Sequence, residues 1–497
     1  MIYPTFEEFK RLAQKGNVIP VYREILADLE TPVSAFLKLG ESDYSYLLES
    51  VESQRNVGRY SFLATNPSLV FSSKGRVATF TNYKAGKRTC RTYDCRAGES
   101  PLDEIRKIVK GFKFVEVDGL PRFCGGLIGY MGYDMIRFFE NIPDKNPDDL
   151  NAPDCVFMLS QDLIVFDHVS RKIKIVSNAI LSGKSHKDLK KAYSAAKRAI
   201  EALLRKIKAP IKNETFPEQK KTDIKVASNM SKNEFSAAVR KAKEYIRAGD
   251  IIQVVLSQRF KVKLASRPID IYRSLRSVNP SPYMFYLKLD DMVLVGSSPE
   301  LLVRCQDKVV ETRPIAGTRP RGLNEAQDET LIRELLADKK EKAEHLMLVD
   351  LGRNDLGRVC RFGSVKVSEF MQVEKYSHVM HIVSNVLGRL KPGKDALDAL
   401  VSCFPAGTVS GAPKIRAMEI IDELEPARRG PYAGAIGYFS FSGNLDSCII
   451  IRTIVIKNKY IYIQAGAGIV NDSDPGREYN ETVNKARALF ESVKIAK

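Results

Sequence analysis

Long β-rich runs, in which strand-like segments are separated only by short polar turns, constrain the fold of this chain most. Two such runs span residues 155–178 and 447–468, and their turns read HVSRK and KNKY. This spacing predicts hairpins, because a few residues can join antiparallel strands whereas parallel strands need a crossover of about a dozen. Amphipathic helical patterns separate the β-rich runs, at residues 101–112, 231–250, 328–351 and 477–496. We therefore predict an antiparallel α+β fold rather than a βαβ-wound sheet.

The length of the chain and one polar segment indicate two regions. A chain of 497 residues exceeds what one hydrophobic core usually organises. Residues 211–230 are rich in lysine and polar side chains and lack apolar periodicity, so we interpret them as a linker. Ser231 and Glu234 then form the pattern of a capping box, which predicts that a helix begins there. We predict an N-terminal region of residues 1–210 and a C-terminal region of residues 231–497.

The composition is that of a globular protein. Hydrophobic residues make up 44% of the chain and charged residues 28%. The N-terminus lacks an apolar signal core and the eight cysteines are scattered, so we expect a cytoplasmic protein with reduced thiols. The net charge of +18 arises from 78 basic residues interspersed with 60 acidic ones, which disfavours a nucleic-acid-binding surface. An acidic substrate suits the same excess of positive charge.

Acidic residues in two unusual segments predict a site for a hard cation. Glu344 lies in AEHLMLVDLGRND (343–355), while Glu478 and Glu481 lie in QAGAGIVNDSDPGREYNET (464–482). Oxygen ligands suit Mg²⁺, which one or two protein carboxylates typically hold together with an anionic substrate. Surface pairing with nearby lysines is the usual fate of such acids and stays open as the alternative. The pairing of these acids around Mg²⁺ is our first functional hypothesis.

Two glycine-rich turns are suited to bind an anion through backbone N–H groups. The first, PIAGTRPRG (314–322), adds two arginines, although a tight surface turn explains it equally well. The second, FPAGTVSGAPKIRAMEII (404–421), leads into a helix and offers the hydroxyl of Thr408. It lacks the GxxxxGK[ST] spacing of a nucleotide P-loop, so ATP use is not supported.

Several isolated polar residues interrupt apolar patterns. Arg452 occurs in an otherwise apolar strand pattern, where an unpaired guanidinium is costly, so its anionic partner is either the protein or a substrate. Gly466 and Gly468 on the next strand would let a ligand approach the backbone. Glu300 follows a strand and is suited to a cleft, although a solvated carboxylate is commoner at such a position. His381 is as suited to catalysis as to a structural role.

Taken in this order, the motifs of residues 230–490 resemble the chorismate-utilising enzyme family. The resemblance implies a large α/β structure with two facing antiparallel sheets and flanking helices. It implies that Glu344 and Glu481 hold Mg²⁺ against the ring carboxylate of chorismate, with Glu478 near the ion. Arg452 and Tyr432 would bind the enolpyruvyl carboxylate. The other residues implied to line the pocket are Gly317, Thr318, Gly466, Ala467, Gly468 and Lys485.

Two positions distinguish the branches of this family. Isochorismate and salicylate synthases carry a water-activating lysine at the position of Gln253, and an amide cannot act as that base. Aminodeoxychorismate synthases often carry a lysine nucleophile at the position of Ala316, where alanine leaves room for ammonia. The resemblance therefore implies conversion of chorismate and ammonia to anthranilate and pyruvate, the first step of tryptophan biosynthesis. Formation of aminodeoxychorismate, which keeps the enolpyruvyl group, is the alternative.

Three residues are candidates for proton transfer in that reaction. We expect Glu300 to act as general acid toward the departing C4 hydroxyl, which requires burial to raise the pKa of its carboxyl group. We expect His381 to assist removal of the C2 proton, with Thr408 in support.

Two further segments are similar to the regulatory elements of that branch. YLLESVE (46–52) contains Ser50, and NPSPYMFY (279–286) contains the remaining residues of an implied tryptophan site. Those residues are Pro282, Tyr283 and Met284. The resemblance thus implies feedback inhibition by tryptophan.

The source of ammonia is implied to be a partner protein. None of the eight cysteines occurs in the GxCxG setting of a nucleophile elbow, so we find no glutamine-hydrolysing motif. We therefore expect a separate glutamine amidotransferase subunit to deliver ammonia to this chain.

Overall fold

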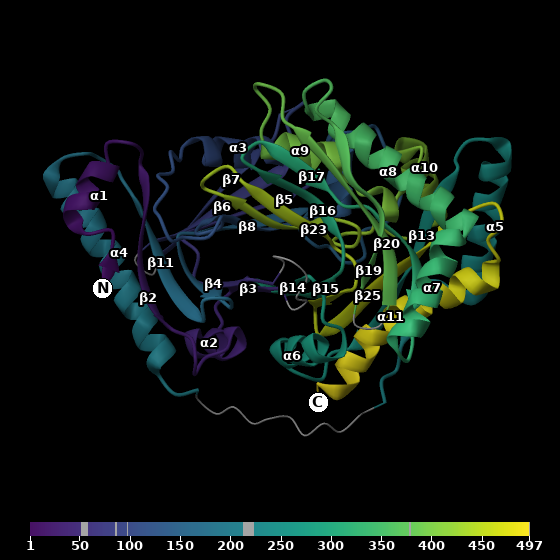
Figure 1. Cartoon of the computed structure of the whole chain (residues 1–497), viewed down its shortest axis with the longest axis horizontal. Helices are drawn as coiled ribbons and strands as arrows, with labels where there is room; N and C mark the ends of the chain where they lie inside the picture. Colours follow the sequence, from purple (N-terminus) through teal and green to yellow (C-terminus); the bar gives the residue numbers. More distant parts are fainter. Residues whose placement is uncertain (51–57, 85–86, 97, 212–222, 377–378, 497) are drawn as a thin grey trace.

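The computed structural model describes residues 1–50, 58–84, 87–96, 98–211, 223–376 and 379–496. Its strands form two large sheets that face each other, and helices cover their outer faces (Figure 1). All named strand pairs are antiparallel. The predicted two-sheet antiparallel α+β architecture is therefore confirmed.

The first sheet contains strands from both the N-terminal and the C-terminal region of the chain. Its strands, in spatial order, are β1 (Ile2–Tyr3), β2 (Val18–Leu26), β11 (Lys172–Ile180), β10 (Asp162–Asp167), β4 (Tyr60–Thr65), β3 (Tyr44–Glu49), β14 (Tyr283–Leu289), β15 (Met292–Ser298), β24 (Thr453–Lys457), β25 (Tyr460–Ile469), β13 (Gln253–Lys263) and β12 (Ala227–Ser228), with β21 (Gly411–Ala412) beside β13.

The second sheet is built in the same way. Its strands, in spatial order, are β18 (Ile315–Pro320), β20 (Val379–Arg389), β17 (Val309–Thr312), β16 (Leu301–Gln306), β23 (Leu445–Ile449), β22 (Ala435–Ser440), β8 (Gly126–Met131), β9 (Cys155–Ser160), β5 (Leu69–Lys74), β6 (Val77–Lys84) and β7 (Lys87–Asp94), with β19 (Lys366–Lys375) on the other side of β20.

Helices cover the outer face of each sheet. The first sheet packs against α1 (Phe6–Leu12), α2 (Pro32–Leu39), α4 (His186–Lys208), α6 (Pro268–Val278) and α11 (Pro475–Ile495). The second sheet packs against α3 (Pro101–Lys110), α8 (Lys339–Val359), α9 (Ala396–Cys403) and the 3₁₀ turn η1 (Tyr133–Phe138). The remaining helical segments are α5 (Lys232–Ala248), α7 (Glu325–Ala337), α10 (Lys414–Leu424) and the 3₁₀ turn η2 (Gly407–Val409). None of the described helices combines the length and apolarity that a membrane crossing requires.

The apolar runs in the sequence arise because central strands are buried on both faces. In β10, Leu163 and Val165 face the core between the two sheets. The alternate residues, Ile164 and Phe166, face the helices outside the first sheet. A strand with both faces covered needs apolar residues at successive positions, so hydrophobic alternation is lost.

One predicted helix is two helices in the structure. The pattern at residues 328–351 belongs to α7 and α8, which are separated at Asp338. The Asp338 carboxylate accepts hydrogen bonds from the backbone N–H groups of Lys340 and Glu341, so it begins a new helix where the periodicity alone suggests continuity. By contrast, α5 begins at the capping box predicted at Ser231 and Glu234.

The N-terminal and C-terminal regions both contribute strands to each sheet. In the first sheet β3 pairs with β14, and in the second β8 pairs with β22. The predicted division into residues 1–210 and 231–497, joined by a linker, stays a proposal about the chain, and most of that linker lies outside the described residues.

Two glycines face each other where β8 meets β22. Gly129 pairs with Gly437 across the two strands. A Cβ atom at Gly129 would lie 1.8 Å from the backbone oxygen of Val156, and one at Gly437 would lie 2.1 Å from that of Asp446. Backbone cannot yield as a side chain does, so only glycine fits this junction.

We predict that Gly129→Ala lowers the free energy of unfolding by about 3 kcal/mol, because the added methyl group overpacks the junction. Urea unfolding followed by circular dichroism measures this change. Gly357→Ala is the control: a Cβ atom there meets nothing within 4 Å, so helix propensity favours a gain of about 1 kcal/mol. An unchanged unfolding midpoint for Gly129→Ala would contradict the close approach of these strands.

Candidate active site

The floor of the candidate site is formed by β25 and its neighbour β13. Gly466 and Gly468 lie on the same face of β25, and a Cβ atom at either would collide with a polar side chain. At Gly466 the Tyr432 hydroxyl would be 2.8 Å away, and at Gly468 the Gln253 Nε2 atom would be 2.5 Å away. The intervening Ala467 is fully buried in the core beneath α5 and α10, so only its backbone can contribute to the site.

Glu300 lies between β15 and β16, and it is buried. Thr408, in η2, donates a hydrogen bond of 2.8 Å from its Oγ1 to the Glu300 Oε1 atom. Burial raises the pKa of Glu300 to about 7, although the Thr408 bond and the positive charge of Lys485 both lower it. A carboxyl group with this pKa can hold and release a proton near neutral pH, which is what general acid catalysis requires.

His381 lies beside the bulge in β18 that contains Gly317, whose φ is +66°. The His381 Nδ1 atom is 2.9 Å from the Gly317 carbonyl oxygen and 3.1 Å from Thr318 Oγ1. A carbonyl can only accept, so this contact assigns the proton to Nδ1 and leaves Nε2 with a lone pair. Burial lowers the pKa of His381, which keeps the ring neutral. His381 is thus suited to accept a proton at Nε2.

Arg452 lies outside the strands, which corrects the prediction that it belongs to a continuous apolar strand. β23 ends at Ile449 and β24 begins at Thr453, and Arg452 has a φ of +50° in the connection. Its Nη1 atom donates to the Lys485 carbonyl oxygen at 2.7 Å. Burial lowers the pKa of Arg452, although the charge of Glu481 acts to raise it. Within the described part of the chain it forms no ion pair, so an anionic ligand would supply its countercharge.

Lys485 links the floor of the site to α11. Its Nζ atom donates to the Gly466 carbonyl oxygen at 2.9 Å and pairs with Glu481 Oε1 at 2.7 Å. Both side chains of this ion pair are more than a third exposed, so the pair contributes little to stability. They are available to a ligand for the same reason.

The predicted metal ligands come from two helices. Glu344, on α8, accepts a 3.2 Å hydrogen bond from Gln253 Nε2, while the Gln253 Oε1 atom is buried without a partner. Glu478 and Glu481 lie on α11. The pKa of Glu478 is raised, mainly by burial and further by the charge of Glu481, although a hydrogen bond with Ser473 acts to lower it. Among the described residues, no three His, Cys, Asp or Glu side chains group closely enough to enclose a metal.

These oxygen atoms fit Mg²⁺ as an ion shared with a substrate. Mg²⁺ is usually bound by one or two carboxylates, several waters and substrate oxygens rather than by a closed protein cage. The Glu344 carboxylate and the unpartnered Gln253 Oε1 atom are two such donors on one side, and Glu481 is a third on α11. The donor set therefore suits a hard cation.

The four predicted inhibitor-binding residues line one cavity of about 870 Å³ in contact with both sheets. These residues are Ser50, Pro282, Tyr283 and Met284. The Ser50 hydroxyl oxygen is buried without a partner. The Tyr283 hydroxyl donates to Asp446 at 3.0 Å, and Arg304 donates to the same carboxylate at 2.9 Å. The cavity thus presents charged groups and an unpartnered hydroxyl to any ligand.

Two buried residues beside the site were missed by the sequence analysis. Arg429 and Glu425 form an ion pair beneath Tyr432. Their spacing of four residues near Tyr432 is the only local signal, and surface pairs commonly show the same spacing.

The family model for chorismate binding enzymes matches residues 51–491. The solved structure of a menaquinone-specific isochorismate synthase from Escherichia coli is 21% identical, covers 98% of both chains and shares the fold with a TM-score of 0.70. The chain therefore belongs to the chorismate binding enzyme family.

Closer relatives place it within that family. Anthranilate synthase component 1 of Acetivibrio thermocellus is 49% identical over 100% of this chain and 99% of its own length. The corresponding protein of Aquifex aeolicus is also 49% identical, over 99% of this chain and 98% of its own. The crystal structure of anthranilate synthase component I from Streptococcus pneumoniae, 38% identical, has a TM-score of 0.77 and covers 94% of this chain and 99% of that chain. The chain is a chorismate-converting lyase of the anthranilate synthase component I type.

We predict that the buried Glu300 makes stability depend on pH. Its pKa is about 7 in the folded protein against an ordinary 4.5, so ionisation carries a penalty that is absent at low pH and grows as pH rises toward 7. Relative to Glu300→Gln, the wild-type free energy of unfolding should fall by about 2 to 3 kcal/mol between pH 5 and pH 8, measured by urea unfolding. Glu329→Gln, at an exposed position, should show a much smaller difference. A pH-independent difference for Glu300→Gln would contradict a protonated, buried carboxyl.

Proposed function

We propose that this chain is the cytoplasmic, chorismate-using subunit of an anthranilate synthase. It converts chorismate and ammonia to anthranilate, pyruvate and water, as the first step of tryptophan biosynthesis. The observation that carries the proposal is the pairing of a buried, protonatable Glu300 with Thr408 in a site where Gln253 and Ala316 provide no lysine. Ammonia from outside the chain is then the nitrogen nucleophile, and Glu300 is the proton donor.

Arg452 and Tyr432 bind the enolpyruvyl carboxylate of chorismate in this proposal. Arg452 is partly buried and lacks an ion-pair partner among the described residues, so a carboxylate restores charge balance. The Tyr432 hydroxyl lies over the space left by Gly466, beside Lys485. The other end of the site, with Glu344 and Glu481, faces the ring carboxylate, and Mg²⁺ bound there would neutralise that carboxylate and orient the ring.

We propose two proton transfers, which the surroundings of Glu300 and His381 support. As ammonia attacks C2, Glu300 gives its proton to the C4 hydroxyl, which leaves as water. The intermediate then loses its C2 proton to His381 Nε2, the nitrogen with the lone pair. The enolpyruvyl group leaves as the enolate of pyruvate as the ring becomes aromatic, and the enolate takes up a proton to give pyruvate. Gly317 and Thr318 hold the His381 ring in the required orientation.

Tryptophan is the proposed inhibitor, and Ser297 supports a route from its cavity to the substrate site. Tyr283 and Met284 pair across the strands with Ser298 and Ser297. The Ser297 hydroxyl donates to the Asn279 carbonyl oxygen and contacts the Ser281 hydroxyl, and both residues lie just before Pro282 in the chain. The Ser297 backbone N–H donates to the Arg452 carbonyl oxygen at 3.1 Å. A shift of β14 on binding would therefore act on Arg452 through β15.

The proposed reaction predicts a defined product and nitrogen source. With chorismate, ammonium chloride and Mg²⁺, the purified chain should form fluorescent anthranilate and one equivalent of pyruvate. Glutamine should not replace ammonium unless a glutamine amidotransferase subunit is added, and chelation of Mg²⁺ should abolish the reaction. A product that keeps its enolpyruvyl group would instead identify an aminodeoxychorismate synthase, and activity with glutamine alone would refute the need for a partner.

We predict that Ser50→Leu weakens inhibition by tryptophan at least tenfold, because the side chain fills part of the cavity where the hydroxyl lies. The inhibitory concentration of tryptophan measures the effect, and the rate without tryptophan should stay within about twofold. Ser50→Ala, which removes only the hydroxyl, should also weaken inhibition. Ser45→Ala is its matched control and should leave inhibition unchanged: both hydroxyls are buried without a partner, but Ser45 is not among the residues that line the cavity. Equal inhibition of wild type and Ser50→Leu would place the tryptophan site elsewhere.

A further inference from the structure

Arg429 is among the largest fully buried side chains of the protein, and only 2% of it is exposed. Its guanidinium donates to both oxygens of Glu425, at 2.9 Å and 2.6 Å. It also donates to the carbonyl oxygens of Val409 and Val255, each at 2.7 Å. Val409 is the last residue of η2, which carries Thr408, and Val255 lies on β13, which begins at Gln253.

The same guanidinium lies between two tyrosine rings. It is 5.5 Å from the ring centre of Tyr432 and 4.8 Å from that of Tyr133. A cation over an aromatic face is attracted to the ring, and more strongly when both are removed from water. Arg429 therefore orients Tyr432, the proposed carboxylate ligand, without itself reaching the substrate site.

Glu425 extends these contacts to β13 and β25. Its Oε1 atom accepts hydrogen bonds from the backbone N–H and the hydroxyl of Ser257, both at 2.8 Å. Gln464 on β25 donates to the Ser257 hydroxyl at 2.8 Å and accepts from Arg259 Nε at 3.0 Å. The pair thus joins η2, Tyr432 and both strands of the site floor.

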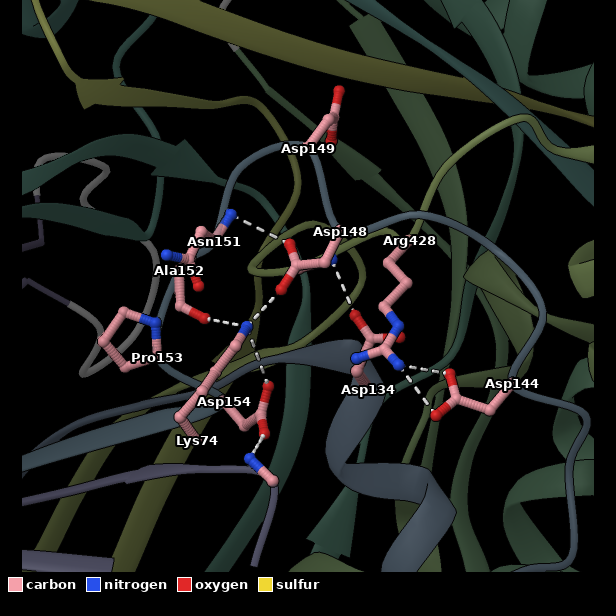
Figure 2. Close-up of polar contacts among 12 residues, drawn as sticks. Lys74, Asp134, Asp144, Asp148, Asp149, Asn151, Ala152, Pro153, Asp154 and Arg428 are labelled. Carbon is pink, nitrogen blue, oxygen red and sulfur yellow. Dashed lines mark hydrogen bonds and ion pairs between the residues drawn. The ribbon is translucent and has the colours of Figure 1, made fainter. Parts of the chain in front are cut away.

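The N-terminal region holds this segment from the other side. The Gly430 backbone N–H donates to Asp134 at 2.8 Å, and the Arg428 backbone N–H donates to the Pro147 carbonyl oxygen at 3.0 Å. Figure 2 shows the Arg428 side chain facing Asp144, with which it forms an ion pair of 2.6 Å. The Lys74 ammonium group binds the loop of residues 148–154, through the Asp148 carboxylate and the Ala152 carbonyl oxygen (Figure 2).

A role in stability alone does not explain this pair. Removing two charges from water costs several kcal/mol per ion, and apolar residues of similar volume are often at least as stabilising. Here the contacts of the pair fall on the elements that carry Thr408, Tyr432, Gln253 and the glycines of the floor. These contacts favour a role in which Arg429 and Glu425 hold the site-bearing elements in their relative positions.

We propose that Arg429 and Glu425 are positioning residues for the reaction: they hold Tyr432 against the substrate carboxylate and hold η2 so that Thr408 stays bonded to Glu300. The proposal rests on the proposed function of Tyr432 and Glu300. It assigns to the pair no contact with chorismate or ammonia.

Substitution of the pair should change chorismate binding and the pH profile together. Arg429→Lys keeps the charge but cannot make all four hydrogen bonds, so we expect KM for chorismate to rise at least tenfold while KM for ammonia stays within twofold. Glu300 must be protonated to act, so the rate falls as pH rises through its pKa of about 7. Thr408 and Lys485 both lower that pKa; a weakened Thr408 bond therefore moves the alkaline limb to higher pH.

The experiment compares Arg429→Lys, Glu425→Gln and the double variant Arg429→Met/Glu425→Leu with Thr408→Val, using the full chain. Thr408→Val removes the hydrogen bond to Glu300 directly and sets the size of the pH shift. Lys174→Arg, a charge-conserving change in a partly buried ion pair of the N-terminal region, is the control and should leave both KM values and the pH profile unchanged. Loss of chorismate absorbance is followed, so the comparison holds whichever product forms.

We expect Arg429→Lys to fold and to show the selective rise in KM for chorismate. We also expect the alkaline limb of its pH–rate profile to move to higher pH, as in Thr408→Val. The double variant tests the same point if single variants fold poorly, because it leaves no unpaired buried charge. Unchanged KM and pH profile in any folded variant would overturn the proposal. So would a loss of activity that follows the loss of folded protein alone. Absence of anthranilate from the wild type would instead refute the proposed function.

Discussion

Antiparallel pairing between the two halves of the chain is the constraint on which the rest of the structure depends. The β3–β14 pairing places Glu49 opposite Met284, so Ser50 meets the segment 282–284 in one cavity. The β8–β22 pairing continues into the contacts between Asp134 and Gly430. Because both junctions are backbone ladders inside large sheets, neither half can move far without loss of the other's hydrogen bonds. Cavity and substrate site are thereby parts of one framework.

Burial sets the chemistry of the site. It raises the pKa of Glu300 to about 7 and lowers the pKa of His381, so an acid and a base with different tasks can coexist near neutral pH. Arg452 is partly buried and has no ion-pair partner among the described residues, which prepares the site for a carboxylate. Arg429 is fully buried, but Glu425 compensates its charge. Arg452 is thus left to bind the ligand, while Arg429 is neutralised within the protein and connects structural elements.

Features with a local physical cause could be predicted from the sequence. The capping box at Ser231 and the hairpins depend on neighbours along the chain or on strand periodicity. Predictions failed where a single residue broke a pattern, as Asp338 does between α7 and α8. Arg452 also fits a strand by composition, but its φ of +50° places it in a turn between two strands.

Residue pattern alone determined the antiparallel α+β class, because strand and helix periodicity depend on spacing along the chain. It also marked acids, glycines and an arginine as candidates for a site, whose roles remain proposals. Only the tertiary structure decided which of them meet. The Thr408–Glu300 bond joins residues 108 positions apart, and the Tyr272–Glu49 bond joins residues 223 positions apart. Such contacts depend on how twisted sheets pack and on which side chains are thereby removed from water, and no local pattern encodes that. For the same reason the buried Arg429–Glu425 pair could not be told from a surface pair until the fold was known.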